Sequence, residues 1–129
     1  MKVKLICYPA CSTCKKAEQL LKTKHINYQY QDIKKQPPTK KELEQYHQQS
    51  ELPLKRFFNT SGNSYKALQL ASRFNQLSED ELFELLASDG MLIKRPILLI
   101  NNQFATIGFK PETWEALLKW IFIYHQPKF

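Results

Sequence analysis

The sequence predicts an α/β fold built on a four-stranded mixed sheet flanked by helices. The first part of the chain has the pattern of a strand, a helix and a second strand, and the last part has that of two strands followed by a helix. Between these halves, about residues 39–88 carry the apolar spacing and the capping residues of helices. The predicted order is therefore β-α-β, a helical insertion, and β-β-α.

The first half begins with a mostly apolar strand at residues 3–8, of the kind that is buried in a parallel sheet, and Pro9 ends it. After Cys11, apolar residues recur on one face of a helix that extends to about Lys24. Residues 27–33 alternate in the manner of a second strand. Because the connection is a helical crossover, the two strands are expected to be parallel.

The insertion contains two capping boxes, Thr39-Lys40-Lys41-Glu42 and Ser78-Glu79-Asp80-Glu81. Each of them is typical of a helix N-terminus. The side chain of the first residue accepts from the backbone N–H of the fourth, and the side chain of the fourth accepts from the backbone N–H of the first. The helix that follows the second box is expected to end at Asp89-Gly90. Further short helices are predicted at residues 53–58 and 65–70.

The last part starts with an apolar, β-branched strand at residues 97–100. Asn101-Asn102 is a hairpin turn signal, and residues 103–107 return as an antiparallel strand. Pro111 takes the first position of the final helix, where proline is favoured. The complete order is that of a thioredoxin-like fold, and a length of 129 residues predicts one such domain over residues 1–129.

Composition narrows the function classes. Hydrophobic residues make up 43% of the chain, which excludes a disordered protein. The formal net charge is +7, but the basic residues occur as dispersed pairs. This distribution indicates solvated helix faces and a general attraction for anions, and it argues against direct DNA binding. No apolar run reaches the roughly 18 residues of a membrane span, and the N-terminal stretch does not resemble a secretory signal. We therefore expect a cytoplasmic protein with no membrane partner.

The motif Cys11-Ser12-Thr13-Cys14 lies between the first strand and the first helix. Cysteines at this spacing on a first helical turn can close a disulfide, and the free N–H groups of Ser12 to Cys14 favour a thiolate at Cys11. Lys15 adds positive charge, whereas Cys14 belongs to the core-facing stripe of the helix. We predict that Cys11 attacks and Cys14 resolves the mixed disulfide. Two structural cysteines are the alternative interpretation.

Cys7 leaves a further alternative open. Together with Cys11 and Cys14 it matches the C-x3-C-x2-C spacing of three-cysteine iron–sulfur sites in radical-generating enzymes. Against this, Cys7 lies inside a predicted strand and shares its side-chain direction with Val3 and Leu5, and the chain is too short for the large barrel of such enzymes. A zinc site would lack its fourth ligand. We therefore expect no metal and interpret Cys7 as a small core residue.

The segment Lys94-Arg95-Pro96 precedes the third strand. In a thioredoxin-like fold a cis-proline stands at this point beside the cysteine loop, which predicts a cis bond before Pro96. Arg95 would then lie close to Cys11 and hold an anion or favour the thiolate. The alternative is a surface arginine before a trans proline. The loop Asn59-Thr60-Ser61-Gly62 either supplies amide and hydroxyl donors to the same anion or simply ends a helix.

Three motifs carry a family resemblance: Cys-Ser-Thr-Cys-Lys-Lys-Ala at 11–17, Leu-Lys-Arg-Phe-Phe-Asn-Thr-Ser-Gly at 54–62 and Leu-Ile-Lys-Arg-Pro-Ile at 92–97. With them, the chain resembles the arsenate-reductase/Spx (ArsC/Spx) family from about Val3 to Trp120. The resemblance implies a thioredoxin-type core with an inserted helical region, Cys11 as the nucleophile, and Arg95-Pro96 as the family's arginine and cis-proline. Arsenate reductases of this family have two further arginines, where this sequence has Asn59 or Thr60 and Lys110.

The resulting prediction is a small cytoplasmic thiol–disulfide oxidoreductase that resembles glutaredoxin-dependent arsenate reductases. The resemblance implies a small anionic or disulfide substrate and no bound cofactor. It also implies glutathione with glutaredoxin, or thioredoxin, as the electron donor. The alternative is a redox-sensing transcription regulator of the Spx type that binds RNA polymerase. The loop at residues 57–62 favours the reductase branch, and a polymerase-contacting segment is not recognisable around residues 50–54.

Overall fold

The computed structural model describes residues 1–124, and a four-stranded sheet forms its centre. The strands are β1 (Val3–Cys7), β2 (Gln29–Asp32), β3 (Ile97–Ile100) and β4 (Gln103–Ile107), in the order β2-β1-β3-β4. β1 pairs with β2 in parallel, whereas the β1–β3 and β3–β4 pairs are antiparallel. The predicted mixed sheet and the thioredoxin-like fold are thereby confirmed.

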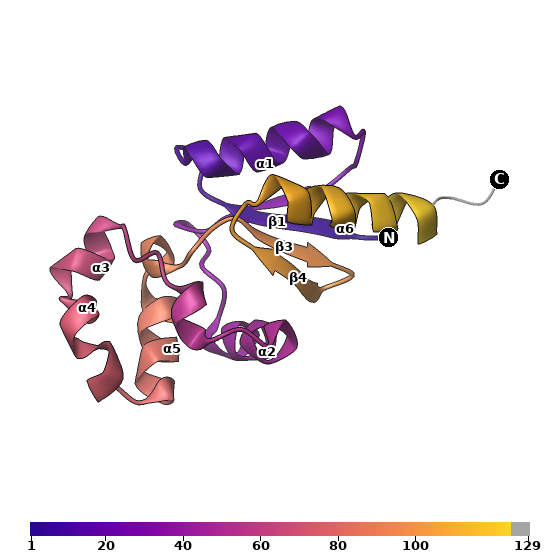
Figure 1. The fold of residues 1–129 in the computed structure, drawn as a ribbon. Coiled ribbons are helices and arrows are strands. Elements are labelled where there is room, and N and C mark those ends of the chain that lie inside the picture. Colours follow the sequence, from indigo (N-terminus) through magenta and orange to yellow (C-terminus); the bar gives the residue numbers. More distant parts are fainter. Residues whose placement is uncertain (125–129) are drawn as a thin grey trace.

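Helices cover both faces of the sheet (Figure 1), with α1 (Ser12–Thr23) and α6 (Pro111–Tyr124) on one face. On that side Val3, Leu5 and Cys7 of β1 pack against the apolar stripes of the two helices, which contribute Cys14, Ala17, Leu21, Trp114, Leu118 and Ile121. Alternate β1 residues point the other way, because successive side chains of a strand face opposite sides of its sheet. The shared side-chain direction expected for Val3, Leu5 and Cys7 is confirmed.

The insertion covers the opposite face with α2 (Lys40–Ser50) and α5 (Glu79–Ser88), and both predicted capping boxes are formed. Two short helices, α3 (Asn63–Ala67) and α4 (Leu70–Arg73), lie between them in the chain. The sequence predicted one helix at 65–70, but Gln69 has a left-handed φ of 54° and divides it. Short 3-10 helices occur at Leu54–Phe57, Phe74–Gln76 and Gly90–Leu92.

Gly90 anchors the end of the insertion to the sheet. A Cβ atom at this position would lie 1.9 Å from the carbonyl oxygen of Ile33, the residue that follows β2. Only glycine permits that approach of two backbones. Beyond it, Ile93 forms an isolated antiparallel bridge with Phe58, and the cis bond between Arg95 and Pro96 leads into β3. The insertion therefore delivers the segment at 93–96 to the edge where the cysteine loop lies.

Candidate active site

The cysteine loop is a tight connection between β1 and α1. The Cys11 N–H donates to the Tyr8 carbonyl oxygen over 3.0 Å, and Cys11 is the extended residue immediately before the helix. Its side chain is half-buried, whereas Cys14, one turn into the helix, is only 1% exposed. All three cysteines are free thiols. The difference in access predicted for Cys11 and Cys14 is confirmed.

A polar cleft of about 320 Å³ opens above Cys11, and four separate chain segments build it. Its walls come from the cysteine loop, the loop after Phe57, and the segments before β3 and after β4: Cys11, Thr13, Phe58, Asn59, Thr60, Ser61, Lys94, Arg95, Gly108 and Phe109. Backbone hydrogen bonds hold these segments together, among them Lys94 N–H to the Phe57 carbonyl (2.9 Å) and Gly108 N–H to the Pro96 carbonyl (2.8 Å).

Five of the residues predicted from the sequence meet in this cleft: Cys11, Thr13, Asn59, Thr60 and Arg95. Cys14 lies below it in the core, and Pro96 is buried behind it. Ser12 and Lys15 are exposed and lie outside its lining, because the helix turns their side chains away from the cleft. Lys110, at the place of a family arginine, is also exposed and outside the lining.

The predicted cis bond between Arg95 and Pro96 is confirmed, and the Arg95 side chain has an aromatic neighbour. Its guanidinium carbon lies 5.5 Å from the centre of the Tyr8 ring, which stabilises a cation. One terminal nitrogen donates weakly to the Ile93 carbonyl oxygen (3.4 Å). The Nε atom is buried and has no hydrogen-bond partner among the described residues. Arg95 therefore retains donors for an incoming anion.

Lys94 is a cleft residue that the sequence analysis did not single out. Its side chain crosses Gly108, where a Cβ atom would lie 2.9 Å from the lysine Cε, and Gly108 has a φ of +79°. Glycine is required there both for this conformation and for the space. Lys94 therefore adds a second cation next to Arg95. The available signal was its position beside Arg95, but the sequence alone does not show on which side it projects.

The three cysteine thiols lie close enough together to influence one another's ionisation. The Tyr8 N–H donates to the Cys14 Sγ over 3.4 Å. The interaction with the neighbouring Cys7 thiol and this hydrogen bond lower the pKa of Cys14 to about 7, although burial opposes the shift. Cys11 and the positive charge of Arg95 act in the same direction. The interaction with Cys14 and burial raise the pKa of Cys7 far above its ordinary value. Of these two buried thiols, Cys14 is the one whose charged form is favoured.

The opposite pKa shifts of Cys7 and Cys14 predict that the stability of the reduced protein depends on pH. Folding lowers the pKa of Cys14 from 9.0 to about 7, so ionised Cys14 stabilises the folded protein. This stabilisation is complete above pH 9 and is lost as the pH falls through about 7. Folding raises the pKa of Cys7, so above pH 9 the thiol ionises more readily in the unfolded chain than in the folded protein. The stability present below pH 9 is therefore lost as the pH rises further. We expect the free energy of unfolding to rise by about 1–2 kcal/mol between pH 6.5 and 9 and then to fall. Urea unfolding with a reductant would measure it, and an equal rise in Cys14→Ala would contradict the assignment.

A comparison with known proteins identifies the family. The ArsC family model matches residues 7–117, a range that includes the cysteine loop and every wall of the cleft. The chain belongs to the ArsC family. The family predicted from the three sequence motifs is therefore confirmed.

Relatives in this ArsC family include a Bacillus subtilis protein, YusI, which is 49% identical over 84% of this chain and 91% of its own length. The global transcriptional regulator Spx of Lactiplantibacillus plantarum is 31% identical, over 81% of this chain and 76% of Spx. A structure titled a possible arsenate reductase, from Streptococcus mutans, superposes with a TM-score of 0.83 at 45% identity and covers 89% and 96% of the two chains. The structure of arsenate reductase from Vibrio cholerae superposes with a TM-score of 0.75 at 29% identity, and the match covers 92% of this chain and 97% of that one.

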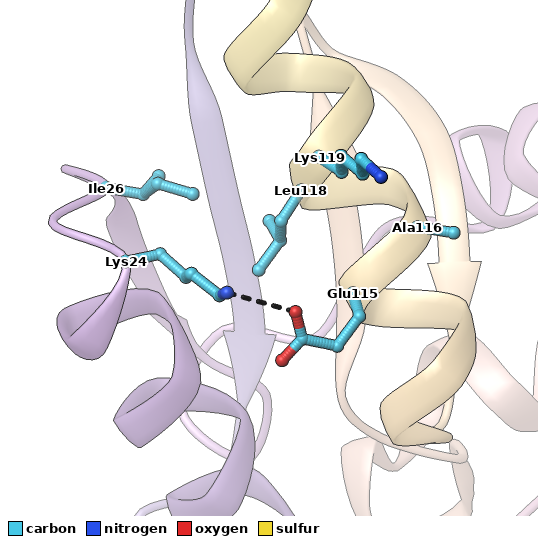
Figure 2. Close-up of a pocket in the computed structure, with 6 residues that line it drawn as sticks. All are labelled: Lys24, Ile26, Glu115, Ala116, Leu118 and Lys119. Carbon is cyan, nitrogen blue, oxygen red and sulfur yellow. Dashed lines mark ion pairs between the residues drawn. The ribbon is translucent and has the colours of Figure 1, made fainter.

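Another cavity, of about 420 Å³, lies at the opposite end of α1 from the ArsC-family cysteine loop (Figure 2). It lies between the end of α1 and helix α6, and the Lys24–Glu115 ion pair (3.0 Å) crosses it. Its lining contains no cysteine. Among the described residues, no group of three or more metal-ligating side chains is arranged to hold an ion, and no helix is long and apolar enough to span a membrane.

Proposed function

We propose that the protein is a small thiol–disulfide oxidoreductase of the arsenate-reductase-like branch, in which Cys11 and Cys14 are the redox pair. The observation that carries this proposal is the position of Cys11. Cys11 lines the cleft, whereas Cys14, in the first turn of α1, is buried at 1% exposure. A nucleophile open to substrate, followed one helical turn later by a buried resolving thiol, is the arrangement that a two-step exchange requires.

The exchange proceeds in two balanced steps. The Cys11 thiolate attacks one sulfur of a substrate disulfide, the substrate S–S bond breaks, and the first substrate thiol leaves and takes up a proton. The Cys14 thiolate then attacks the Cys11 sulfur, the Cys11–Cys14 bond forms, and the second substrate thiol leaves. Two electrons pass from the protein dithiol to the substrate. An external thiol, from glutathione with glutaredoxin or from thioredoxin, restores the dithiol.

The walls of the cleft favour an anionic substrate. Lys94 and Arg95 supply two positive charges, and Thr13, Asn59 and Thr60 supply hydroxyl and amide donors. A mixed disulfide of glutathione carries carboxylates and matches this lining, and so does a tetrahedral oxyanion such as arsenate. The cleft holds a single guanidinium. Since lysine lacks the planar fork of arginine, we propose disulfides with an anionic thiol as the preferred substrate class.

The proposal is tested by assaying a glutathione mixed disulfide, an uncharged disulfide and arsenate in parallel, with glutaredoxin and with thioredoxin systems. We expect the glutathione mixed disulfide to be reduced fastest. After mild oxidation, non-reducing peptide mapping should find a Cys11–Cys14 link and a free Cys7 thiol. Absence of turnover with every disulfide, or a disulfide that contains Cys7, would refute the proposal.

One finding favours a second candidate function. The Spx relative is a transcriptional regulator at 31% identity, and an Spx-type regulator would use the same cysteine pair as a redox sensor. Co-purification with RNA polymerase before and after oxidation discriminates the two functions. A redox-dependent complex without disulfide turnover would favour the regulator, and turnover without a complex would favour the reductase.

A further inference from the structure

Lys34 lies beside the cysteine loop, although it is outside the lining of the cleft. It follows β2, and the parallel pairing of β1 with β2 brings the carboxyl ends of both strands to the same edge of the sheet. There the Lys34 Nζ lies 6.0 Å from the centre of the Tyr8 ring. Tyr8 belongs to the cysteine loop, because its carbonyl oxygen accepts from the Cys11 N–H. The turn after β2 thus delivers a lysine to the neighbourhood of the nucleophile.

Two independent contacts hold the backbone of Lys34 in place. Its N–H donates to the Asp32 carboxylate over 2.9 Å, which closes the turn after β2. Gly90 packs so closely against this turn that a Cβ atom there would lie 3.3 Å from the Lys34 backbone nitrogen. The starting point of the lysine side chain is therefore fixed, although the side chain itself is exposed to solvent.

The Tyr8 ring has two cations as neighbours. The Arg95 guanidinium carbon lies 5.5 Å from its centre, and the Lys34 Nζ lies 6.0 Å from it. The ring attracts each cation, but two positive charges beside one ring repel each other. Neither of them has a carboxylate partner, because the ion pairs in the described part of the chain use only Lys24 and Lys40 as cations. An anion bound near both groups would relieve their repulsion.

We propose that Lys34 is a specificity-determining residue, which binds a second carboxylate of a disulfide substrate whose first carboxylate is bound by Arg95. The inference rests on the proposed function and narrows its substrate class. A thiol with one carboxylate is bound by the cleft alone, whereas a thiol with two carboxylates reaches both cations beside the Tyr8 ring. The site therefore favours dianionic over monoanionic disulfides. Lys34 acts on binding only, so the bonds formed and broken in the exchange are unchanged.

The test compares Lys34→Gln with Lys35→Gln as its matched control. Both lysines are exposed and both donate their backbone N–H to the Asp32 carboxylate, but of the two only Lys34 lies over the Tyr8 ring. The substrates are mixed disulfides of 2-thiopyridine with mercaptoethanol, thioglycolate and mercaptosuccinate, which carry no carboxylate, a single carboxylate and a pair of carboxylates.

We expect Lys34→Gln to lower kcat/KM for the mercaptosuccinate disulfide about two- to fivefold and to leave that for the mercaptoethanol disulfide unchanged. The loss should shrink at high salt, because the contact is exposed to solvent. Lys35→Gln removes the same charge and should retain the preference of the wild type for the dianionic substrate.

A second readout measures binding without turnover. The S-methyl thioethers of thioglycolate and mercaptosuccinate contain no disulfide, and their protection of Cys11 from alkylation by iodoacetamide gives a Kd for each. The dianionic thioether should bind more tightly than the monoanionic one, and Lys34→Gln should remove this preference. An unchanged preference in Lys34→Gln, or an equal loss in Lys35→Gln, would overturn the inference and leave Lys34 as a solvated surface charge. If no disulfide is turned over, the proposed function fails, but the protection experiment still decides the role of Lys34.

Discussion

Cys11→Ser is expected to lower disulfide turnover by about a thousandfold or more and to leave the protein folded. Cys11 is the thiol that lines the cleft, while Cys7 and Cys14 are 0% and 1% exposed. Neither of those two sulfurs can reach an external disulfide, so no thiol replaces the lost nucleophile. The fold should be preserved, because Cys11 makes no side-chain cap to α1 and serine is a favoured residue at that position.

The matched control for this prediction is Cys14→Ser. That variant keeps the nucleophile and loses the resolving thiol, so it should form one mixed disulfide per chain and stop there. Mass spectrometry of the intact protein measures the trapped adduct, and steady-state assays measure turnover. If Cys11→Ser retained turnover, or if the adduct formed on another cysteine, the assignment of the nucleophile would be wrong.

Local patterns were sufficient to predict the elements that frame the site. The capping boxes at Thr39 and Ser78 and the turn at Asn101-Asn102 depend on neighbouring residues alone, and all three are formed as predicted. The alternation within β1 also predicted that Cys7 faces the core together with Leu5. Such signals are readable because the chemistry that satisfies the backbone at these points is confined to a few successive residues.

The walls of the cleft were less accessible to sequence reasoning. Lys94 lies against Gly108, and Tyr8 lies against Arg95, through contacts between residues far apart in the chain. The position of Lys15 outside the cleft depends on how α1 is rotated over the sheet. The packing of Cys7 and Cys14 in one core cluster likewise requires β1 to lie under α1. Side-chain proximity of this kind is set by tertiary packing and not by local propensity.

Arg95→Ala is expected to slow turnover of an anionic disulfide by roughly tenfold to a hundredfold while the fold persists. The thiolate of Cys11 and an anionic substrate repel each other as they approach. Amides at the start of α1 offset part of this repulsion through partial charges, whereas a guanidinium offers a full charge and two parallel donors. Arg95 is half-buried at the cleft, its Nε is unpartnered among the described residues, and Tyr8 fixes its orientation.

Two comparison variants separate a specific role of Arg95 from a general loss of positive charge. Arg56→Ala removes the same charge from an exposed site outside the cleft and should leave turnover unchanged. Arg95→Lys should recover only part of the rate, because an ammonium group lacks the planar fork. The measurement is kcat/KM for a glutathione mixed disulfide and for an uncharged disulfide, at low and at high salt. The defect should be smaller for the uncharged substrate, because the guanidinium has no anion to bind there. Equal kcat/KM for wild type and Arg95→Ala on the anionic substrate would mean that Arg95 does not bind it, and Lys94 would then be the cation that does.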